Sequence, residues 1–425
     1  MPGFQHPRFA RLALGGFLIL WLALLIGVTV LLAVGGRPTP QDLGQTLDGA
    51  WRFHAGDDLR WAAPGAKDDD WDRITLVSRP EVHDGDVGIP GYLDGWEARG
   101  HPKLEGYGWY RRQVTLPPRG DLVLVAPLAV DDGYEVYWNG RRVGGVGRLT
   151  GAPRVSASRP LLIRLPDAGG ERTAVLAIRA YMQPGFGRDG KSGGLRTAPV
   201  LASRAEGEAL YRAQWSRWIA GYVADAAEPL AMLALALLAV VLAPALARPT
   251  FARWAALALV ASGGLRLGNP IAVWTDLDSV PGLVWRNGVV LAPLTLLFWT
   301  IAWNQWTDGR DRRPVSLAAV AAWAAMVLAA LTKIHVLEDL GRSLFAALLA
   351  VIAIRIVRRR DQAPLALAAM VFVAVALFAA ALSKFGVPGI WFPFGIGVSR
   401  SQYAYAVALP LVAYAIFAAK PTART

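Results

Sequence analysis

Long, predominantly apolar runs alternate with short polar connections along most of this chain. The first run, LALGGFLILWLALLIGVTVLLAV (12–34), exceeds the roughly 20 residues that a helix needs to cross the hydrocarbon core of a bilayer. The short connections favour antiparallel neighbours, so the pattern predicts one N-terminal helix followed by a bundle of seven transmembrane helices. The seven later runs follow a polar segment and lie at 222–246, 251–270, 283–303, 315–333, 340–357, 363–382 and 401–419.

The first run has two interpretations. A cleavable signal peptide would have a shorter apolar region, about 7–15 residues, followed by a small-residue cleavage site. The run at 12–34 is longer and ends in AVGGRP. We therefore favour an uncleaved signal-anchor helix, with the signal peptide as the alternative.

The distribution of basic residues predicts the orientation of the helices. With the N-terminus inside, thirteen Lys and Arg residues lie at the cytoplasmic ends and six at the opposite ends. The positive-inside rule then predicts a multi-pass protein of a bacterial inner membrane with both termini cytoplasmic. The predicted parts are 1–36 (cytoplasmic N-terminus and signal anchor), 37–217 (periplasmic domain), 218–420 (seven-helix domain) and 421–425 (cytoplasmic tail).

The polar segment 37–217 has the pattern of a β-domain. Short alternating or apolar runs such as WYRRQVTL, DLVLVAPLAV and TAVLAIRAY are separated by Gly, Pro and Asp at the spacing of a β-sandwich. In YEVYWNGRRVGG, Asn139-Gly140 can adopt the positive φ angles of a type I′ turn and predicts a hairpin. On its first strand Tyr134, Val136 and Trp138 share one face.

Composition and charge narrow the possible chemistry. The 425 residues carry a formal charge of +12, but segment 37–217 holds 25 basic and 23 acidic residues, so the excess lies beside the apolar runs. This distribution does not call for a nucleic-acid partner. The chain has no Cys and five widely spaced His, which argues against disulfides, thiolate chemistry and a His-clustered metal site. We expect no metal and no cofactor.

Five blocks of the polar segment resemble, in the same order, the sugar-binding domain of family-two glycoside hydrolases. They are LDGAWRFHAGD (47–57), DDDWDRITLVSRP (68–80), GYGWYRRQVTLP (106–117), YEVYWNGRRVGGVG (134–147) and RTAVLAIRAY (172–181). The resemblance implies a galactose-binding-like jelly roll and a saccharide as a ligand class. Apolar helices stand where those enzymes carry their catalytic barrel, so no hydrolysis, and no enzyme, is expected.

The overall layout resembles bacterial seven-transmembrane receptors with diverse intracellular signalling modules. In that group an exported domain and seven helices precede a cytoplasmic cyclase, kinase or phosphatase. Here the chain ends in AAKPTART, which is too short for such a module. The resemblance therefore implies that the output lies in a partner protein, or that the chain is a truncated form.

Two aromatic, Gly-rich loops are the candidate ligand sites of the exported domain, because loops on a rigid scaffold commonly carry binding. Solvated loops without a ligand are the alternative. The aromatic residues Trp51, Phe53, Trp71, Trp109 and Tyr110, by contrast, are expected in the core. The loop candidates are Tyr92, Asp94, Trp96, Glu97, His101 and Tyr107 in the first loop and Tyr181, Phe186, Arg188 and Asp189 in the second.

Charged residues at the outer ends of the helices form a second candidate site. Charge in a bilayer is costly, so these residues suggest an outward-facing pocket or a surface on which the exported domain docks. Ordinary loop charges within an aromatic belt, in contact with membrane lipid, are the alternative. The candidates are Arg266, Arg286, Lys333, Arg342, Lys384 and Arg400.

These patterns favour a membrane sensory receptor, or the input half of one, whose jelly roll binds an extracytoplasmic ligand such as a saccharide. An envelope carbohydrate-binding or polysaccharide export-associated protein is the alternative. A membrane-embedded enzyme has little support, since HVLED (335–339) is the one cluster of His with carboxylates.

Overall fold

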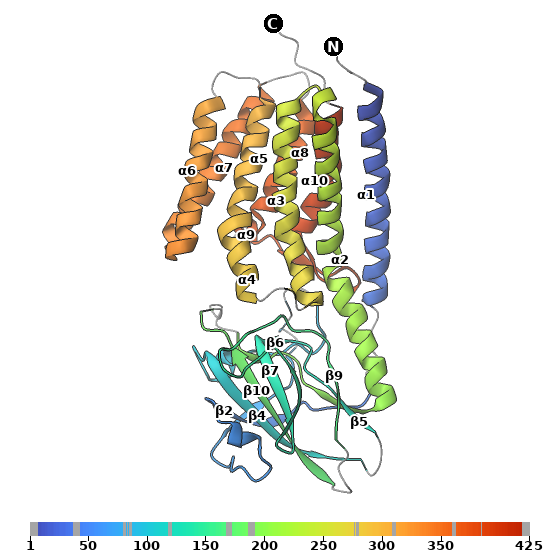
Figure 1. The fold of residues 1–425 in the computed structure, drawn as a ribbon, viewed down its shortest axis with the longest axis vertical. Coiled ribbons are helices and arrows are strands. Elements are labelled where there is room, and N and C mark those ends of the chain that lie inside the picture. Colours follow the sequence, from blue (N-terminus) through green and yellow to red (C-terminus); the bar gives the residue numbers. More distant parts are fainter. Residues whose placement is uncertain are drawn as a thin grey trace.

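The computed structural model describes residues 7–36, 43–79, 82, 84, 87–117, 121–166, 172–185, 192–275, 277, 280–307, 312–358, 363–383 and 385–418. It has a β-sandwich-like region and a set of apolar helices at one end of this region (Figure 1). The first turn of α1 and the last turn of α10 lie at the end of the bundle away from the sandwich.

Two antiparallel sheets make up most of the β-region. One has the strand order β1-β12-β5-β9 and the other β3-β2-β4-β10-β7-β8, and β11 pairs separately with β6. The non-sequential order means that strands distant in the chain pair in space, as in a jelly roll. The strands are β1 (Gln45–Thr46), β2 (Ala50–Ala55), β3 (Asp72–Thr75), β4 (Gly106–Thr115), β5 (Leu122–Val125), β6 (Val130–Asp131), β7 (Gly133–Trp138), β8 (Arg141–Val146), β9 (Leu162–Arg164), β10 (Thr173–Met182), β11 (Gly194–Leu195) and β12 (Val200–Ser203).

The predicted hairpin is confirmed. Strand β7 pairs with β8, and the turn residues Asn139 and Gly140 have φ values of 47° and 82°. Both are positive, as a type I′ turn requires. Tyr134, Val136 and Trp138 belong to the main sandwich core, whereas Tyr137 packs in a separate cluster on the other face.

Aromatic side chains fill the sandwich core. Trp51, Phe53 and Tyr110 lie between the sheets, where Phe53 and Tyr110 pack with their ring centroids 5.0 Å apart. Trp71 and Trp109 are buried on the outer face of the six-stranded sheet, under the segment that contains Trp61. The expectation that these rings serve packing is confirmed by their burial.

Helices occupy all eight predicted apolar runs. Within the described residues, six helical segments are long and apolar enough to cross a membrane. The segments α8 and α10 are not among the six, so the predicted count of seven after the sandwich remains a prediction. The helices are α1 (Pro7–Gly35), α2 (Arg204–Leu242), α3 (Pro249–Trp274), α4 (Val280–Trp285), α5 (Ala292–Trp306), α6 (Arg312–Thr332), α7 (His335–Val357), α8 (Ala363–Leu377), α9 (Ala379–Ser383) and α10 (Arg400–Phe417), with a π-helical turn at Arg286–Leu291 between α4 and α5.

Helix α2 begins well before the predicted apolar run at 222. It starts directly after β12, where the Ser203 hydroxyl accepts a hydrogen bond from the Glu206 N–H and the Glu206 side chain accepts one from the Ser203 N–H. This capping box satisfies two N–H groups of the first turn. The helix therefore passes without a break from the sandwich into the bundle and crosses the predicted boundary at 217 (Figure 1).

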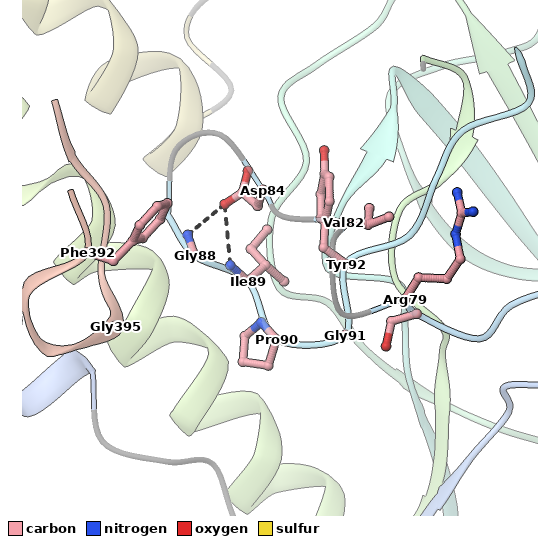
Figure 2. Close-up of a pocket in the computed structure, with 11 residues that line it drawn as sticks. Arg79, Val82, Asp84, Gly88, Ile89, Pro90, Gly91, Tyr92, Phe392 and Gly395 are labelled. Atoms are coloured by element: carbon pink, nitrogen blue, oxygen red, sulfur yellow. Dashed lines mark hydrogen bonds between the residues drawn. The ribbon is translucent and has the colours of Figure 1, made fainter. Parts of the chain in front are cut away.

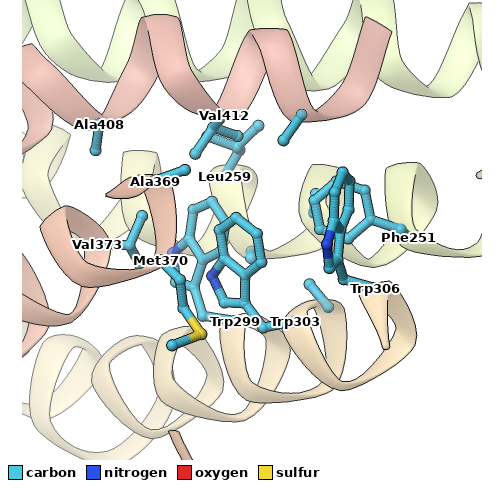
Figure 3. Close-up of a cluster of buried hydrophobic side chains, with 14 of the residues drawn as sticks. Phe251, Leu259, Trp299, Trp303, Trp306, Ala369, Met370, Val373, Ala408 and Val412 are labelled. Atoms are coloured by element: carbon cyan, nitrogen blue, oxygen red, sulfur yellow. The ribbon is translucent and has the colours of Figure 1, made fainter. Parts of the chain in front are cut away.

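Large aromatic rings also fill the centre of the bundle. Figure 3 shows Trp299, Trp303 and Trp306 of α5 beside Phe251 of α3. Trp299 and Trp303 are stacked with an interplanar angle of 18°, and both are fully buried. Small residues such as Ala408 of α10 complete this core, which allows the helices to approach closely.

Candidate functional site at the sandwich–bundle junction

Arg217 of α2 joins three separate segments where the sandwich meets the bundle. Its guanidinium donates hydrogen bonds to the carbonyl oxygens of Gly88 at 3.1 Å, Gly395 at 3.0 Å and Gly36 at 3.5 Å. Gly88 belongs to a sandwich loop, Gly395 to the turn between α9 and α10, and Gly36 directly follows α1. Because the planar guanidinium has five donors in a fixed geometry, one side chain can hold all three segments.

An apolar cluster accompanies this polar contact. Val87 and Ile89 of the sandwich loop pack with Leu128, with Trp218 of α2 and with Val273 of α3. The backbone of the loop is held by Asp84, whose carboxylate accepts hydrogen bonds from the N–H groups of Val87 at 2.6 Å and Gly88 at 2.8 Å. The sandwich and the bundle are thus packed against each other.

A cavity of about 420 Å³ lies in this junction (Figure 2). The sandwich loop forms one wall, and Phe392 and Gly395 of the turn before α10 form the other. A polyhydroxylated small molecule would suit this mixture of apolar surface and a few polar groups. The lining residues are Ser78, Arg79, Val82, Asp84, Gly88, Ile89, Pro90, Gly91, Tyr92, Phe392 and Gly395.

Tyr92 and Asp94, two of the predicted loop residues, are tied to arginines around this cavity. Tyr92 lines the cavity and lies under the guanidinium of Arg196, 4.7 Å from the ring centroid. Burial raises the pKa of the Tyr92 phenol above its ordinary value, so its hydroxyl keeps its proton at neutral pH. The Asp94 carboxylate is ion-paired with Arg79, whose Nε lies 2.9 Å away.

The other described residues of the first loop lie away from this cavity. Trp96 is 0% exposed, and its Nε1 donates a hydrogen bond to the Tyr110 hydroxyl at 2.6 Å. The structure thus places this loop candidate in the core, where Phe53 and Gly193 cover the ring. Glu97 accepts a hydrogen bond from the Lys103 N–H, and His101 packs on Phe53 with ring centroids 4.6 Å apart.

Tyr107 and Tyr181 form a separate pair, with their rings 4.7 Å apart. The guanidinium of Arg179 lies 4.5 Å from the Tyr107 ring centroid, and the Tyr107 hydroxyl donates to the Leu149 carbonyl. Tyr181 is buried, so the pair is part of the packed sheet. The remaining candidates of the second loop, Phe186, Arg188 and Asp189, lie outside the described residues.

A buried charge cluster lies further along α2, inside the bundle. Arg266 of α3 is ion-paired with Asp225 at 2.8 Å and with Glu228 at 2.9 Å. Gln402 of α10 donates to the same Asp225 carboxylate, and Arg266 donates to Ser401. Three helices are thus joined by groups that are costly to bury singly.

Of the predicted outer-end charges, the structure brings Arg266 and Arg342 to one cavity. This cavity of about 210 Å³ is also lined by Ser262, Thr295 and Tyr405. The other described candidates lie apart from it. Arg400 donates to the carbonyls of Ala379 and Pro388 and so holds the turn before α10, Arg286 lies beside Gly268 of α3, and Lys333 is exposed between α6 and α7. Lys384 lies outside the described residues.

Arg217, Asp225 and Glu228 were not predicted as site residues. The acidic pair had a signal in the sequence, since two carboxylates three residues apart share one face of a helix and interrupt an apolar run. Arg217 had no such signal, because the run that predicted this helix begins after it.

Comparisons with known proteins give partial matches only. No protein-family model matches the chain, and no curated protein matches it. Among solved structures it is similar to a β-glucuronidase from Bacteroides uniformis, with 22% identity and a TM-score of 0.26 over 37% of this chain and 17% of that chain.

Two further structures are matched over the same 37% of this chain, each with a TM-score of 0.26. A family-two glycosyl hydrolase from Bacteroides cellulosilyticus has 20% identity, and a β-glycosidase from Bacteroides vulgatus has 19%. The chain covers 20% of each of these enzymes. The β-sandwich-like region is therefore assigned from the observed sheets alone. The glycosidase activities are those of the matched enzymes.

Proposed function

We propose that this chain is the input half of a membrane sensory receptor, in which a ligand bound at the sandwich–bundle junction changes the arrangement of the helices. The observation that carries the proposal is the continuity of α2. The same helix is capped at the end of β12, carries Arg217 in the junction and carries Asp225 and Glu228 in the bundle. A displacement of α2 at the junction therefore also moves Asp225 and Glu228 of the charge cluster.

The junction cavity is the proposed ligand site. A ligand in it touches Tyr92 on the sandwich side and Phe392 on the bundle side. It would therefore bind one relative position of the two parts better than another, which is the requirement for a ligand to shift a conformational equilibrium. The mixture of aromatic faces with Ser78 and Asp84 suits a saccharide or polyol. We propose no reaction for the sandwich and the helices, which would pass the signal to a cytoplasmic output module such as a cyclase, kinase or phosphatase.

The first test is ligand binding by the purified full chain in lipid nanodiscs. Thermal unfolding is measured with a panel of neutral sugars, polyols and acidic sugars, and we expect at least one to raise the melting temperature. Phe392→Ala should reduce that shift because it removes one wall of the cavity. Phe385→Ala is the matched control, since Phe385 is 82% exposed and does not line the cavity.

The second test measures whether ligand binding changes the conformation at the end of the bundle opposite the sandwich. The chain has no cysteine, so a single Arg358→Cys variant can carry a spin label at the end of α7. We expect the active ligand to change the mobility of this label, and Phe392→Ala to abolish the change. Binding without any change at the label would contradict the receptor and leave an envelope carbohydrate-binding protein. If the whole panel leaves the melting temperature unmoved, the saccharide ligand is wrong.

A further inference from the structure

A row of arginines crosses the outer face of the six-stranded sheet. Arg52 of β2 is paired directly with Arg73 of β3 on one side and with Arg111 of β4 on the other. The alternate residues Trp51, Phe53 and Ile74 lie in the core between the sheets, so the three arginines share the opposite face. Like charges placed directly opposite each other on neighbouring strands destabilise a sheet.

This row forms the floor of a cleft of about 480 Å³. Pro64, Ala66 and Asp68 of the segment bonded to Arg111 also line the cleft, as do Gln113 and Val175, which are paired on β4 and β10. Arg112 also lines the cleft. The side chain of Arg112 lies over the Trp51 ring on the other face, so the charges of the cleft are Arg52, Arg73, Arg111 and the Asp68 carboxylate. No residue of the cleft lines the junction cavity.

The arginines have different partners. Arg111 is 3% exposed and holds the covering loop, since its Nε donates to the Asp68 carboxylate at 3.0 Å and its terminal nitrogens donate to the carbonyls of Ala63 and Ala66. Among the residues that the structure describes, Arg52 donates only to the carbonyls of Asp69 and Trp71, at 3.5 and 3.3 Å. In the described part of the chain Arg73 has no hydrogen bond or ion pair. Two guanidinium groups thus have no carboxylate partner within the described ranges.

We propose that this cleft binds an oxyanion, either a carboxylate or a phosphate group, through Arg52 and Arg73. An oxyanion would offset the repulsion along the row, and the guanidinium fork matches both oxyanions with paired hydrogen bonds. The strands β2 and β4 extend away from the helices (Figure 1), which favours a ligand in the aqueous phase. An acidic saccharide and free phosphate both present such an oxyanion. Oxyanion binding in this cleft does not depend on a ligand in the junction cavity, since the two share no lining residue.

The test is calorimetric titration of the full chain in nanodiscs with sodium glucuronate, inorganic phosphate and glucose. We expect glucuronate, phosphate or both to bind, and we expect no measurable heat from glucose at this site because it carries no charge. Added sodium chloride should weaken oxyanion binding because it screens the exposed guanidinium groups. Binding by glucuronate alone identifies an acidic saccharide as the ligand class, and binding by phosphate alone identifies a phosphate group.

Three variants locate the site. Arg73→Gln and Arg52→Gln should each weaken oxyanion binding about tenfold, as expected for the loss of a charge-assisted hydrogen bond. Arg73 is exposed, so Arg73→Gln is not expected to prevent folding, and thermal unfolding checks this. Arg164→Gln, at an exposed arginine of β9 in the other sheet, is the matched control and should bind normally. Absence of binding by both oxyanions, or equal binding by wild type and Arg73→Gln, would overturn the proposal.

Discussion

Arginine side chains hold together segments that are far apart in the sequence. Arg217 bonds to three backbone carbonyls at the junction, and Arg400 bonds to carbonyls before α10. Carbonyl groups in such turns lack the partners that helices and sheets supply. A guanidinium satisfies several of them at once, which explains why Arg217 and Arg400 can be buried with no carboxylate partner among the described residues.

Asp132 makes the stability of the sandwich depend on pH. Burial is the main reason that the pKa of Asp132 is raised to about 6, and neighbouring Asp131 adds to the effect, while the Gln183 N–H opposes it. The folded chain therefore binds this proton more tightly than the unfolded chain, whose pKa is near 3.8. This contribution to stability is full below about pH 4 and is lost as the pH rises through about 6.

We predict that Asp132→Asn removes this part of the pH dependence. The melting temperature of the variant should exceed that of wild type at pH 7 and approach it near pH 4, because the amide is neutral throughout. Thermal unfolding at a series of pH values measures the difference. Asp70→Asn, at an exposed aspartate, is the control and should follow wild type. Identical pH profiles for wild type and Asp132→Asn would contradict the prediction.

Arg266 is predicted to be essential for the stability of the bundle. Arg266→Met leaves Asp225 and Glu228 buried without their cation, which should cost about 3–5 kcal/mol of unfolding free energy. Combining it with Asp225→Asn and Glu228→Gln removes the unpaired charges and should restore much of the loss. Unfolding in detergent measures all variants, with Arg253→Met at an exposed position of α3 as the control. A single variant as stable as wild type would show that the cluster does not stabilise the fold.

At the scale of elements, local chemistry decided what the sequence could predict. The β7–β8 hairpin was predictable because Asn139-Gly140 fixes the turn and the alternation of Tyr134, Val136 and Trp138 fixes the buried face. The start of α2 was not predictable from hydropathy, since residues 204–221 include five charged residues. The helix there is supported by its cap and by packing on β5. Loop residues were the least predictable, because burial of Trp96 depends on contacts with distant strands.

Helix α2 and the sandwich loop approach each other closely at Gly221. A Cβ atom at this position would lie 2.6 Å from Cγ1 and 2.7 Å from Cγ2 of Val87. We predict that Gly221→Ala pushes the loop away from α2 and lowers the melting temperature, and that adding Val87→Ala restores part of the loss because it removes both methyl groups concerned.

The double-mutant cycle isolates this contact, since the two residues touch and their effects should not be additive. Gly16→Ala in α1 is the matched control, because no atom outside its neighbours lies within 4 Å of the added Cβ. Additive losses in the double variant would mean that the loop and the helix are not coupled at this point.

At the scale of the whole molecule, the arrangement agrees with the charge pattern of the sequence. The start of α1 and the end of α10 lie at the end of the bundle opposite the sandwich (Figure 1). Arg248 directly before α3, Arg312 at the start of α6 and Arg355 in the last turn of α7 lie at that same end, because α2, α5 and α7 run away from the sandwich. The positive-inside rule then predicts a sandwich outside the cytoplasm.

Cysteine labelling tests this orientation directly, because the chain has no cysteine of its own. Leu59→Cys places a thiol in the sandwich, where Leu59 is 54% exposed, and Arg358→Cys places one at the exposed end of α7. In bacterial spheroplasts, a membrane-impermeant maleimide should label Leu59→Cys and should label Arg358→Cys only after the membrane is permeabilised. Denatured samples of both variants control for thiol reactivity. Labelling of Arg358→Cys in intact spheroplasts, with protection of Leu59→Cys, would reverse the predicted orientation and place the proposed ligand sites in the cytoplasm.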